Sequence, residues 1–266
     1  MIEDAAPALQ VTVIRCQMQS LDLSLSTGMG ALWRSALGRA IHATSATAFM
    51  DLYGEEQQGR LFALCPPLRA VGPAETFERG VTLFGPHAAH AVAMVQAIQR
   101  MGLDGVGHHR QRALLLGVHD GAGPCRQFDR GWLRSPQTMD SGRWWLNPPV
   151  YATDARGPQT LRIDCLTPVA FTRDNDCRGD IPALEQWVRR ALGRTAQLSQ
   201  AARQSNPIGR SRAKQFIEWA RLAQCGQAVW HAKKVPRRRS SRTGHSMRLP
   251  TRHGAFAYHL SDAHRV

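Results

Sequence analysis

The sequence predicts an α+β protein, and two patterns of hydrophobic periodicity carry that prediction. Residues 9–119 switch between the strand and helix periods in the order strand, helix, strand, strand, helix, strand. A second series opens with a strand near residue 161 and closes on a strand over 254–260. The first order is that of a ferredoxin-like unit. We interpret the second series as another such unit that carries a helical insertion.

The elements of the first unit follow from local sequence. The alternating, β-branched segment LQVTVIR predicts a strand, and the segment ALWRSALGRAIHA places Leu32, Trp33, Leu37 and Ile41 on one helical face. A glycine, Gly102, ends the second helix. The first strand, the two middle strands, the second helix and the last strand are expected at 9–15, 61–65, 78–85, 87–101 and 113–119.

The composition along the chain suggests where the two units meet. Residues 126–160 are rich in Gly, Pro, Arg and Trp, which is typical of a linker with a short strand or two. We therefore expect a first unit over 1–125 and a second over 161–266, which opens with the strand LRIDCL.

Two helices are expected inside the second unit. Asp180 can cap the first, which runs to about residue 203 with Pro182 in its first turn. Ser211 can cap a shorter one that runs to about Gln224 and carries a cationic face. Together with the basic segment after them, these helices form an expected basic insertion over about 180–235.

Charge is distributed very unevenly along the chain. The formal net charge is +14, and 31 of the 34 basic residues are arginine. Residues 1–200 hold 20 basic and 18 acidic residues, whereas residues 201–266 hold 14 basic residues against Glu218 and Asp262. Codon bias does not produce this asymmetry, so we expect a surface that binds nucleic acid; a disordered basic tail is the alternative.

Several classes of protein and site are excluded. No apolar run reaches the roughly 18–20 residues of a membrane span, and the acidic N-terminus lacks the pattern of a secretory signal, so we expect a cytoplasmic protein without a membrane partner. The six cysteines are scattered without the C-x₂-C spacing of a zinc site, and no histidine motif for metal is present. We expect neither a metal nor a cofactor.

Four segments, in order along the chain, resemble a known family. They are GMGALWRSALGRAI, the block FALCPPL with ERGVTLFGPHAAHAVAMVQAIQRMGLDGVGHHRQRALLLGV, the short strand LTPVAF, and RRSSRTGH with HGAFAYHL. The chain is similar here to the CRISPR-associated endoribonucleases of the RAMP superfamily, which process CRISPR precursor RNA and are built from two ferredoxin-like units that resemble RNA-recognition motifs. The short C-terminus, the helical insertion and the arginine excess resemble the type IV branch.

The resemblance implies a metal-independent endoribonuclease that binds the repeat stem-loop of CRISPR precursor RNA. It would cut at the 3′ base of the stem and stay bound to the mature crRNA in an effector complex with other CRISPR subunits. Such cleavage uses the substrate's 2′-OH as nucleophile, so the enzyme must align that hydroxyl, assist its deprotonation and stabilise charge on the phosphorane. DNA would bind without being cut.

The candidate catalytic residues are Arg242, Arg39 and His42. Arg242 lies in the Ser-Ser-Arg motif before the last strand, and His42 matches the family's histidine at the end of the first helix, one turn after Arg39. Each has a plainer interpretation. Arg242 would be part of a solvated charge run, His42 a histidine favoured at a helix C-terminus, and Arg39 an ordinary helix arginine.

The candidate RNA-binding residues are mostly cations. Two glycines, Gly105 and Gly107, let RNA backbone approach closely or merely shape a tight turn. The full set is Arg34, Arg210, Arg212, Lys214, Arg221, Lys233, Lys234, Arg237, Arg238, Arg239, Ser240, Ser241, Arg248, Gly105, Gly107 and His108.

Two other functions remain open from the sequence. A non-catalytic RAMP subunit that only binds guide RNA would share the fold and the charge, and the lack of a decisive His/Tyr/Lys triad favours it. A general RNA- or DNA-binding factor outside CRISPR systems would share the charge alone.

Overall fold

A computed structural model describes the chain over the following residues: 9–24, 30–54, 61–65, 67, 70–107, 109–120, 122–127, 131–132, 134–140, 159–169, 181–206, 208–234, 238–239, 246–247 and 250–260. The chain divides into two compact units, residues 1–149 with 194–207, and residues 150–193 with 208–266. No helix in the described ranges is long and apolar enough to cross a membrane.

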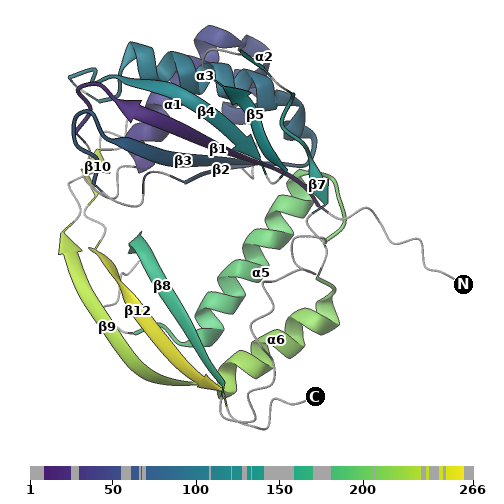
Figure 1. Ribbon diagram of the computed structural model, residues 1–266. Coiled ribbons are helices and arrows are strands. Elements are labelled where there is room, and N and C mark those ends of the chain that lie inside the picture. The colour runs from purple at the N-terminus through teal and green to yellow at the C-terminus, as the bar shows by residue number, and fades with distance from the viewer. Residues whose placement is uncertain are drawn as a thin grey trace, which may run out of the picture. The chain divides into compact units, whose positions relative to one another are not determined.

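The first unit is a sheet with helices on one face (Figure 1). Its strands pair antiparallel in the order β2-β3-β1-β4-β5-β6, and β7 pairs with β1. In chain order the elements are β1 (Gln10–Ser20), α1 (Gly30–Thr44), α2 (Ala46–Tyr53), β2 (Phe62–Cys65), β3 (Thr76–Phe84), the 3₁₀ helix η1 (Gly85–His90), α3 (Ala91–Asp104), β4 (Ala113–Asp120), β5 (Gly123–Gln127), β6 (Gly131–Trp132) and β7 (Met139–Asp140).

The core of the first unit fills the space between sheet and helices. Trp33 and Leu37 of α1 and Met94 of α3 are buried against inward side chains of β1 and β3 such as Ile14 and Leu83. Burying each large apolar side chain contributes roughly 1.5–3 kcal/mol, so α1 and α3 are held in place by packing. The face that Trp33 and Leu37 were predicted to form is the face that packs.

The end of β4 carries a polar cluster that holds the following loop. The Asp120 side chain, 1% exposed, accepts two hydrogen bonds from the Arg134 guanidinium, at 2.5 and 2.6 Å, and one each from the Ala122 and Gln137 backbone N–H groups. These donors, Arg134 first, lower the pKa of Asp120 from 3.8 to about 2.

This cluster makes stability depend on pH at the acid end. A carboxyl with a lowered folded-state pKa stabilises the fold above its unfolded value, here by about 2 kcal/mol, and that contribution is lost as the pH falls from about 4 to about 2. Asp120→Asn should lower the free energy of urea unfolding at pH 6, and the difference from wild type should shrink at pH 2.5. Equal pH profiles for the two proteins would contradict this assignment.

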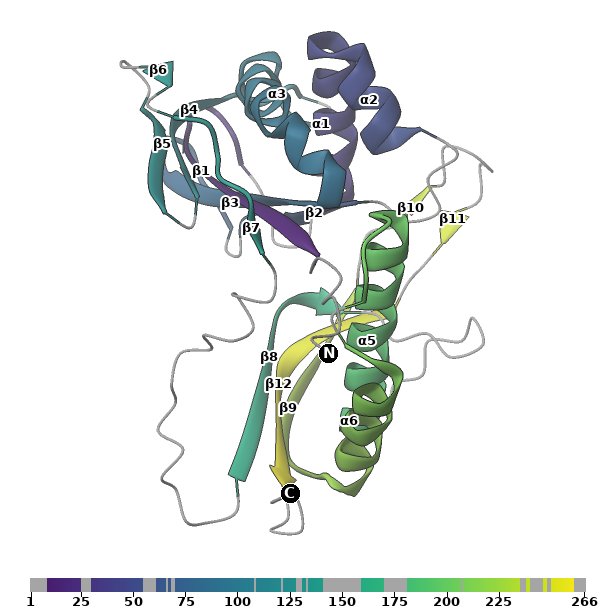
Figure 2. The ribbon, with the colours of Figure 1, turned by 90° about the vertical axis from the view of Figure 1, so that its right-hand side faces the viewer.

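The second unit has a three-stranded antiparallel sheet in the order β8-β12-β9, with β12 in the centre (Figure 2). The pair β10-β11 is also antiparallel. The elements are β8 (Gln159–Val169), α5 (Leu184–Ala201, whose residues from 194 onward are counted with the first unit), α6 (Arg210–Leu222), β9 (Gln224–Lys234), β10 (Arg238–Arg239), β11 (Ser246–Met247) and β12 (Pro250–Leu260). The mixed composition of helices and antiparallel strands is as predicted, but β9 lies in the segment expected to complete a helical insertion.

Tyr258 anchors the small core of the second unit. Its buried hydroxyl donates to the Pro182 carbonyl at 2.6 Å and accepts from Trp187 Nε1–H at 3.0 Å. Phe256 packs on the same Trp187, with ring centroids 5.9 Å apart. One hydroxyl therefore ties β12 to the start of α5.

Tyr258→Phe should destabilise the protein by about 1–3 kcal/mol, because it leaves a carbonyl and an indole N–H in a dry core without a partner. The measurement is urea unfolding followed by tryptophan fluorescence. Gln186→Ala, on the exposed side of the same helix, is the control and should leave the midpoint in place. A midpoint for Tyr258→Phe equal to that of the control would show that the hydroxyl contributes nothing.

Candidate functional site

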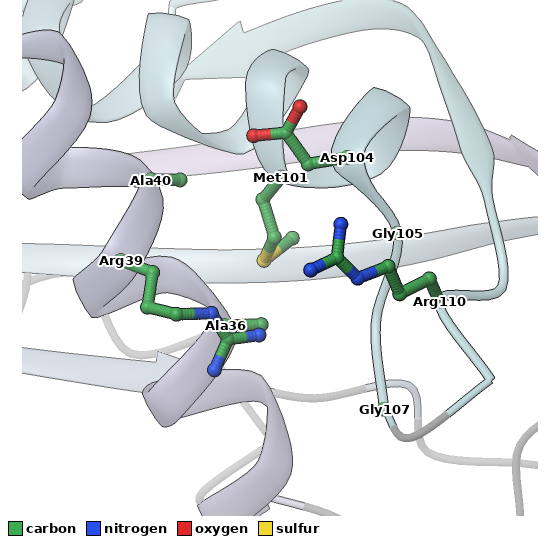
Figure 3. Close-up of a pocket in the computed structure, with 8 residues that line it drawn as sticks. All are labelled: Ala36, Arg39, Ala40, Met101, Asp104, Gly105, Gly107 and Arg110. Atoms are coloured by element: carbon green, nitrogen blue, oxygen red, sulfur yellow. The ribbon is translucent and has the colours of Figure 1, made fainter.

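A pocket opens on the helical side of the first unit, between α1 and the end of α3 (Figure 3). Its volume is about 630 Å³. The lining residues come from α1, from α3 and from the loop after α3, and are Ala36, Arg39, Ala40, Met101, Asp104, Gly105, Gly107 and Arg110. The structure thus brings together Arg39 and both glycines that the sequence singled out.

The loop after α3 has its shape because of glycine. Gly105 has φ +86° and ψ 155°, which only glycine adopts readily, and a Cβ there would overlap the Arg110 carbonyl. Val106 and Gln111 then exchange two backbone hydrogen bonds, at 2.8 and 3.1 Å, and close the turn. Gly105 is therefore needed for the turn, and the turn carries Arg110 to the pocket.

The pocket is lined by two arginines and one aspartate, so its charged side chains are positive on balance. Arg39 and Arg110 reach toward each other from opposite sides (Figure 3). Arg39 donates to the Ser35 hydroxyl at 3.3 Å, and no carboxylate among the described residues pairs with Arg39 or Arg110. Asp104 is the acidic lining residue, and its carboxylate already accepts from Arg100 Nε at 3.3 Å. Two guanidiniums that face one pocket, with no paired carboxylate among the described residues, favour binding of a phosphate.

The other two predicted residues of α1 lie outside this lining. Arg34 is half-buried, with its guanidinium carbon 5.0 Å from the Phe62 ring centroid and 6.0 Å from that of Tyr53. His42 is exposed in the last turn of α1, and its ring meets the Phe49 ring edge-on at 4.8 Å between centroids. The pocket therefore groups Arg39 with Arg110, and not with His42.

Helix α6 presents cations to solvent. Arg210, Arg212 and Lys214 are exposed, and in the described part of the chain no carboxylate pairs with any of them. Arg221 differs, because it donates to Glu185 at 3.1 Å and to Glu218 at 2.6 Å. Three of the four predicted α6 cations are thus available to a polyanion, while the fourth holds α6 to α5.

The structure describes only some of the remaining predicted residues. Lys233 and Lys234 end β9, opposite Thr251 and Pro250 of β12. The two arginines of β10 pair across to Met247 and Ser246 of β11. The others lie outside the described residues: His108, Arg237, Ser240, Ser241, Arg242 and Arg248.

Two pocket residues were not predicted from the sequence. Asp104 and Arg110 both belong to the segment GLDGVGHHR, where the glycines were singled out and the charged residues were not. A charged residue at each end of a glycine-rich turn is the signal that could have found them. In the residues that the structure describes, no three His, Cys, Asp or Glu side chains are grouped to hold a metal ion.

No protein-family model and no curated protein matches the chain. Solved structures do match it. The Cas6 product complex is 13% identical over 96% of this chain and 87% of that one, with a TM-score of 0.56. Cas6 from Thermus thermophilus is 11% identical over 96% and 84%, with a TM-score of 0.54. The partial Cas6-RT-Cas1–Cas2 complex is 12% identical over 99% of this chain and 42% of that one, with a TM-score of 0.59. At such identities the likeness is one of fold, and the fold is that of Cas6 structures.

Proposed function

We propose that this chain is an endoribonuclease that binds the repeat stem-loop of CRISPR precursor RNA and cleaves it at the 3′ base of the stem, without a metal ion. The observation that carries the proposal is the α1–α3 pocket, where Arg39, Arg110 and a glycine turn meet on a fold shared with Cas6. One of the structural neighbours is a Cas6 product complex, which supports a processing reaction for this fold.

The proposed reaction uses the RNA's own 2′-OH as the nucleophile. The 2′-oxygen attacks the adjacent phosphorus, the bond to the 5′-oxygen breaks, and a 2′,3′-cyclic phosphate and a 5′-hydroxyl result. Arg39 and Arg110 would hold the phosphate in line and stabilise the charge that grows on its oxygens. In this proposal Asp104, which lines the same pocket, accepts the 2′-OH proton, and water protonates the departing 5′-oxygen. Arg242 stays a candidate for stabilising charge on that oxygen.

The exposed cations of α6 would hold the RNA stem by its phosphates. Duplex RNA is recognised mainly by shape and backbone, so a few cations and few base contacts suffice.

Changing Arg210, Arg212 and Lys214 together to Gln should reduce the steepness with which log K for RNA binding falls with log salt concentration by about 2 to 3. Fluorescence anisotropy with the repeat hairpin measures this. Arg162→Gln on β8, whose charge is already paired with Asp164 at 3.0 Å, is the control, and a triple variant with the wild-type slope would exclude α6 from binding.

The finer family assignments belong to the same proposal. The order β1-α1-β2-β3-α3-β4 and the sheet order β2-β3-β1-β4 support a ferredoxin-like first unit, and we infer a related second unit. The two basic helices α5 and α6 support the type IV branch. A protein that keeps its product would then join an effector complex with other CRISPR subunits.

A non-catalytic guide-binding subunit is the second candidate, because the described lining of the pocket includes no histidine for proton transfer. Incubating wild type and Arg242→Ala with the repeat RNA separates the two. Cleavage by wild type that is lost in the variant, with binding retained, supports the nuclease. Tight binding without cleavage by either protein supports the guide-binding subunit, and equal affinity for unrelated hairpins would contradict both.

A further inference from the structure

A buried arginine contacts one of the residues that line the pocket of the first unit. Arg79 belongs to β3, where alternate side chains turn inward, and it takes an inward position between Phe77 and Val81. It is 3% exposed and lies opposite Cys16 of β1. A charged group at a core position of a strand is costly, because the ion loses its hydration.

Among the described residues, the neighbours of Arg79 do not neutralise its charge. Its guanidinium carbon lies 4.4 Å from the Trp33 ring centroid, Nη1 donates to the Met101 sulfur at 3.5 Å, and Nε has no acceptor among the described residues. Burial raises the pKa of the Cys16 thiol to about 12, so this neighbour is neutral. Burial also lowers the pKa of Arg79 to about 10, which leaves the guanidinium charged at neutral pH.

Met101 connects the buried cation to the pocket. The same side chain that accepts from Arg79 also lines the pocket, where it lies between the side chains of Arg39 and Arg110 (Figure 3). A methionine side chain is unbranched, has three rotatable bonds and adapts easily to new neighbours. Met101, which is 1% exposed, therefore contacts both the buried cation and the pocket.

We propose that Arg79 is a third guanidinium of the phosphate site, positioned under Met101 so that its charge draws an RNA phosphodiester toward Arg39 and Arg110. This inference rests on the proposed function. Because the site is shielded from water on the Arg79 side, the attraction is felt across Met101 more strongly than it would be in solvent. The bound phosphate supplies the negative charge that the described neighbours of Arg79 do not.

The test compares Arg79→Met and Arg79→Lys with Arg162→Met, an exposed and ion-paired control. The probe is the repeat RNA with a 2′-deoxy nucleotide at the cut, which binds without being cleaved. Arg79→Met should bind it about tenfold more weakly and should cleave normal RNA more slowly, and Arg79→Lys should recover part of both. The unfolding midpoint of Arg79→Met should equal or exceed that of wild type, since an apolar side chain replaces a buried charge.

The opposite pattern would overturn the proposal. A purely structural Arg79, held for its contact with Trp33, predicts a lower midpoint for Arg79→Met together with wild-type binding and cleavage by the folded protein. If wild type does not cleave the repeat RNA at all, the proposed function fails, whereas the role of Arg79 is still decided by binding.

A second readout needs no change at Arg79. Protein labelled with 5-fluorotryptophan is titrated with inorganic phosphate and, separately, with the uncleavable RNA, while the ¹⁹F resonance of Trp33 is followed after assignment with Trp33→Phe. An anion above Met101 should shift this resonance in wild type and much less in Arg39→Ala. A shift with RNA alone assigns the site to the polynucleotide phosphodiester, and no shift with either ligand would rule out an anion site at this pocket.

Discussion

Arg39→Ala should reduce the rate of repeat-RNA cleavage by at least about 100-fold while changing affinity for the RNA only a few-fold. The reason is that Arg39 acts where charge develops on the phosphate, whereas affinity is shared among many cations over the chain. Single-turnover cleavage and equilibrium binding with the uncleavable RNA measure the two quantities separately.

Two further variants sharpen this prediction. Arg39→Lys keeps the charge but loses the planar fork of donors, so it should recover only part of the rate. Arg162→Ala removes an exposed arginine already paired with Asp164 and should cleave like wild type. If Arg39→Ala cleaves as fast as Arg162→Ala, then the α1–α3 pocket is not where the reaction takes place.

Gly105→Ala should destabilise the protein by at least about 2 kcal/mol. At φ +86° a Cβ is strained, and it would also overlap the Arg110 carbonyl, so the turn must open. Because that turn delivers Arg110, the folded fraction of the variant should also cleave more slowly than wild type. Urea unfolding and single-turnover cleavage, corrected for the folded fraction, are the measurements.

Gly193→Ala is the matched control for that change. Gly193 lies inside α5 with nothing within 4 Å of a new Cβ, and alanine is the better helix former. It should stabilise the protein by roughly 0.5–1 kcal/mol, which is the opposite sign. A Gly105→Ala protein as stable as wild type would mean that the loop does not require the backbone conformation described here.

Local patterns were sufficient to predict most of the first unit. The alternation that predicted the strand over 9–15 continues through buried Cys16 and Met18, so β1 runs on to Ser20. The strand expected at 113–119 is β4, and the helix expected at 87–101 begins as the 3₁₀ helix η1 before α3. Periodicity works here because each element buries one face against the same core.

Helix α2 and strand β9 are among the elements that were not predicted, for different reasons. No element was assigned between the first helix and the strand at 61–65, where α2 lies. Ser45 caps α2 by accepting from the Ala48 N–H at 3.2 Å, a signal that the sequence contains. Strand β9 has no such local signal, since Gly226 and its lysines argue against a strand. Its pairing with β12, which lies far along the chain, determines its conformation.

The sequence was sufficient to single out some residues of the site, but not to predict which residues meet in the pocket. Arg39 and the glycines were singled out from the sequence, but their meeting with Arg110 depends on how α1 packs against α3. Arg79 occupies an inward position between two apolar residues of β3, a break in the strand pattern that is visible in the sequence. Which residue lies above it, Met101, follows only from the tertiary structure.

A cleavage assay in EDTA decides whether the chain is a metal-independent ribonuclease. It uses the repeat RNA and the same RNA carrying one 2′-deoxy nucleotide before the cut. We expect cleavage of the first RNA at the 3′ base of the stem, with a 2′,3′-cyclic phosphate on the product, and no cleavage of the second. Cleavage of both RNAs would contradict attack by the 2′-oxygen. Cleavage of neither, despite tight binding, would contradict catalysis and leave a guide-binding subunit.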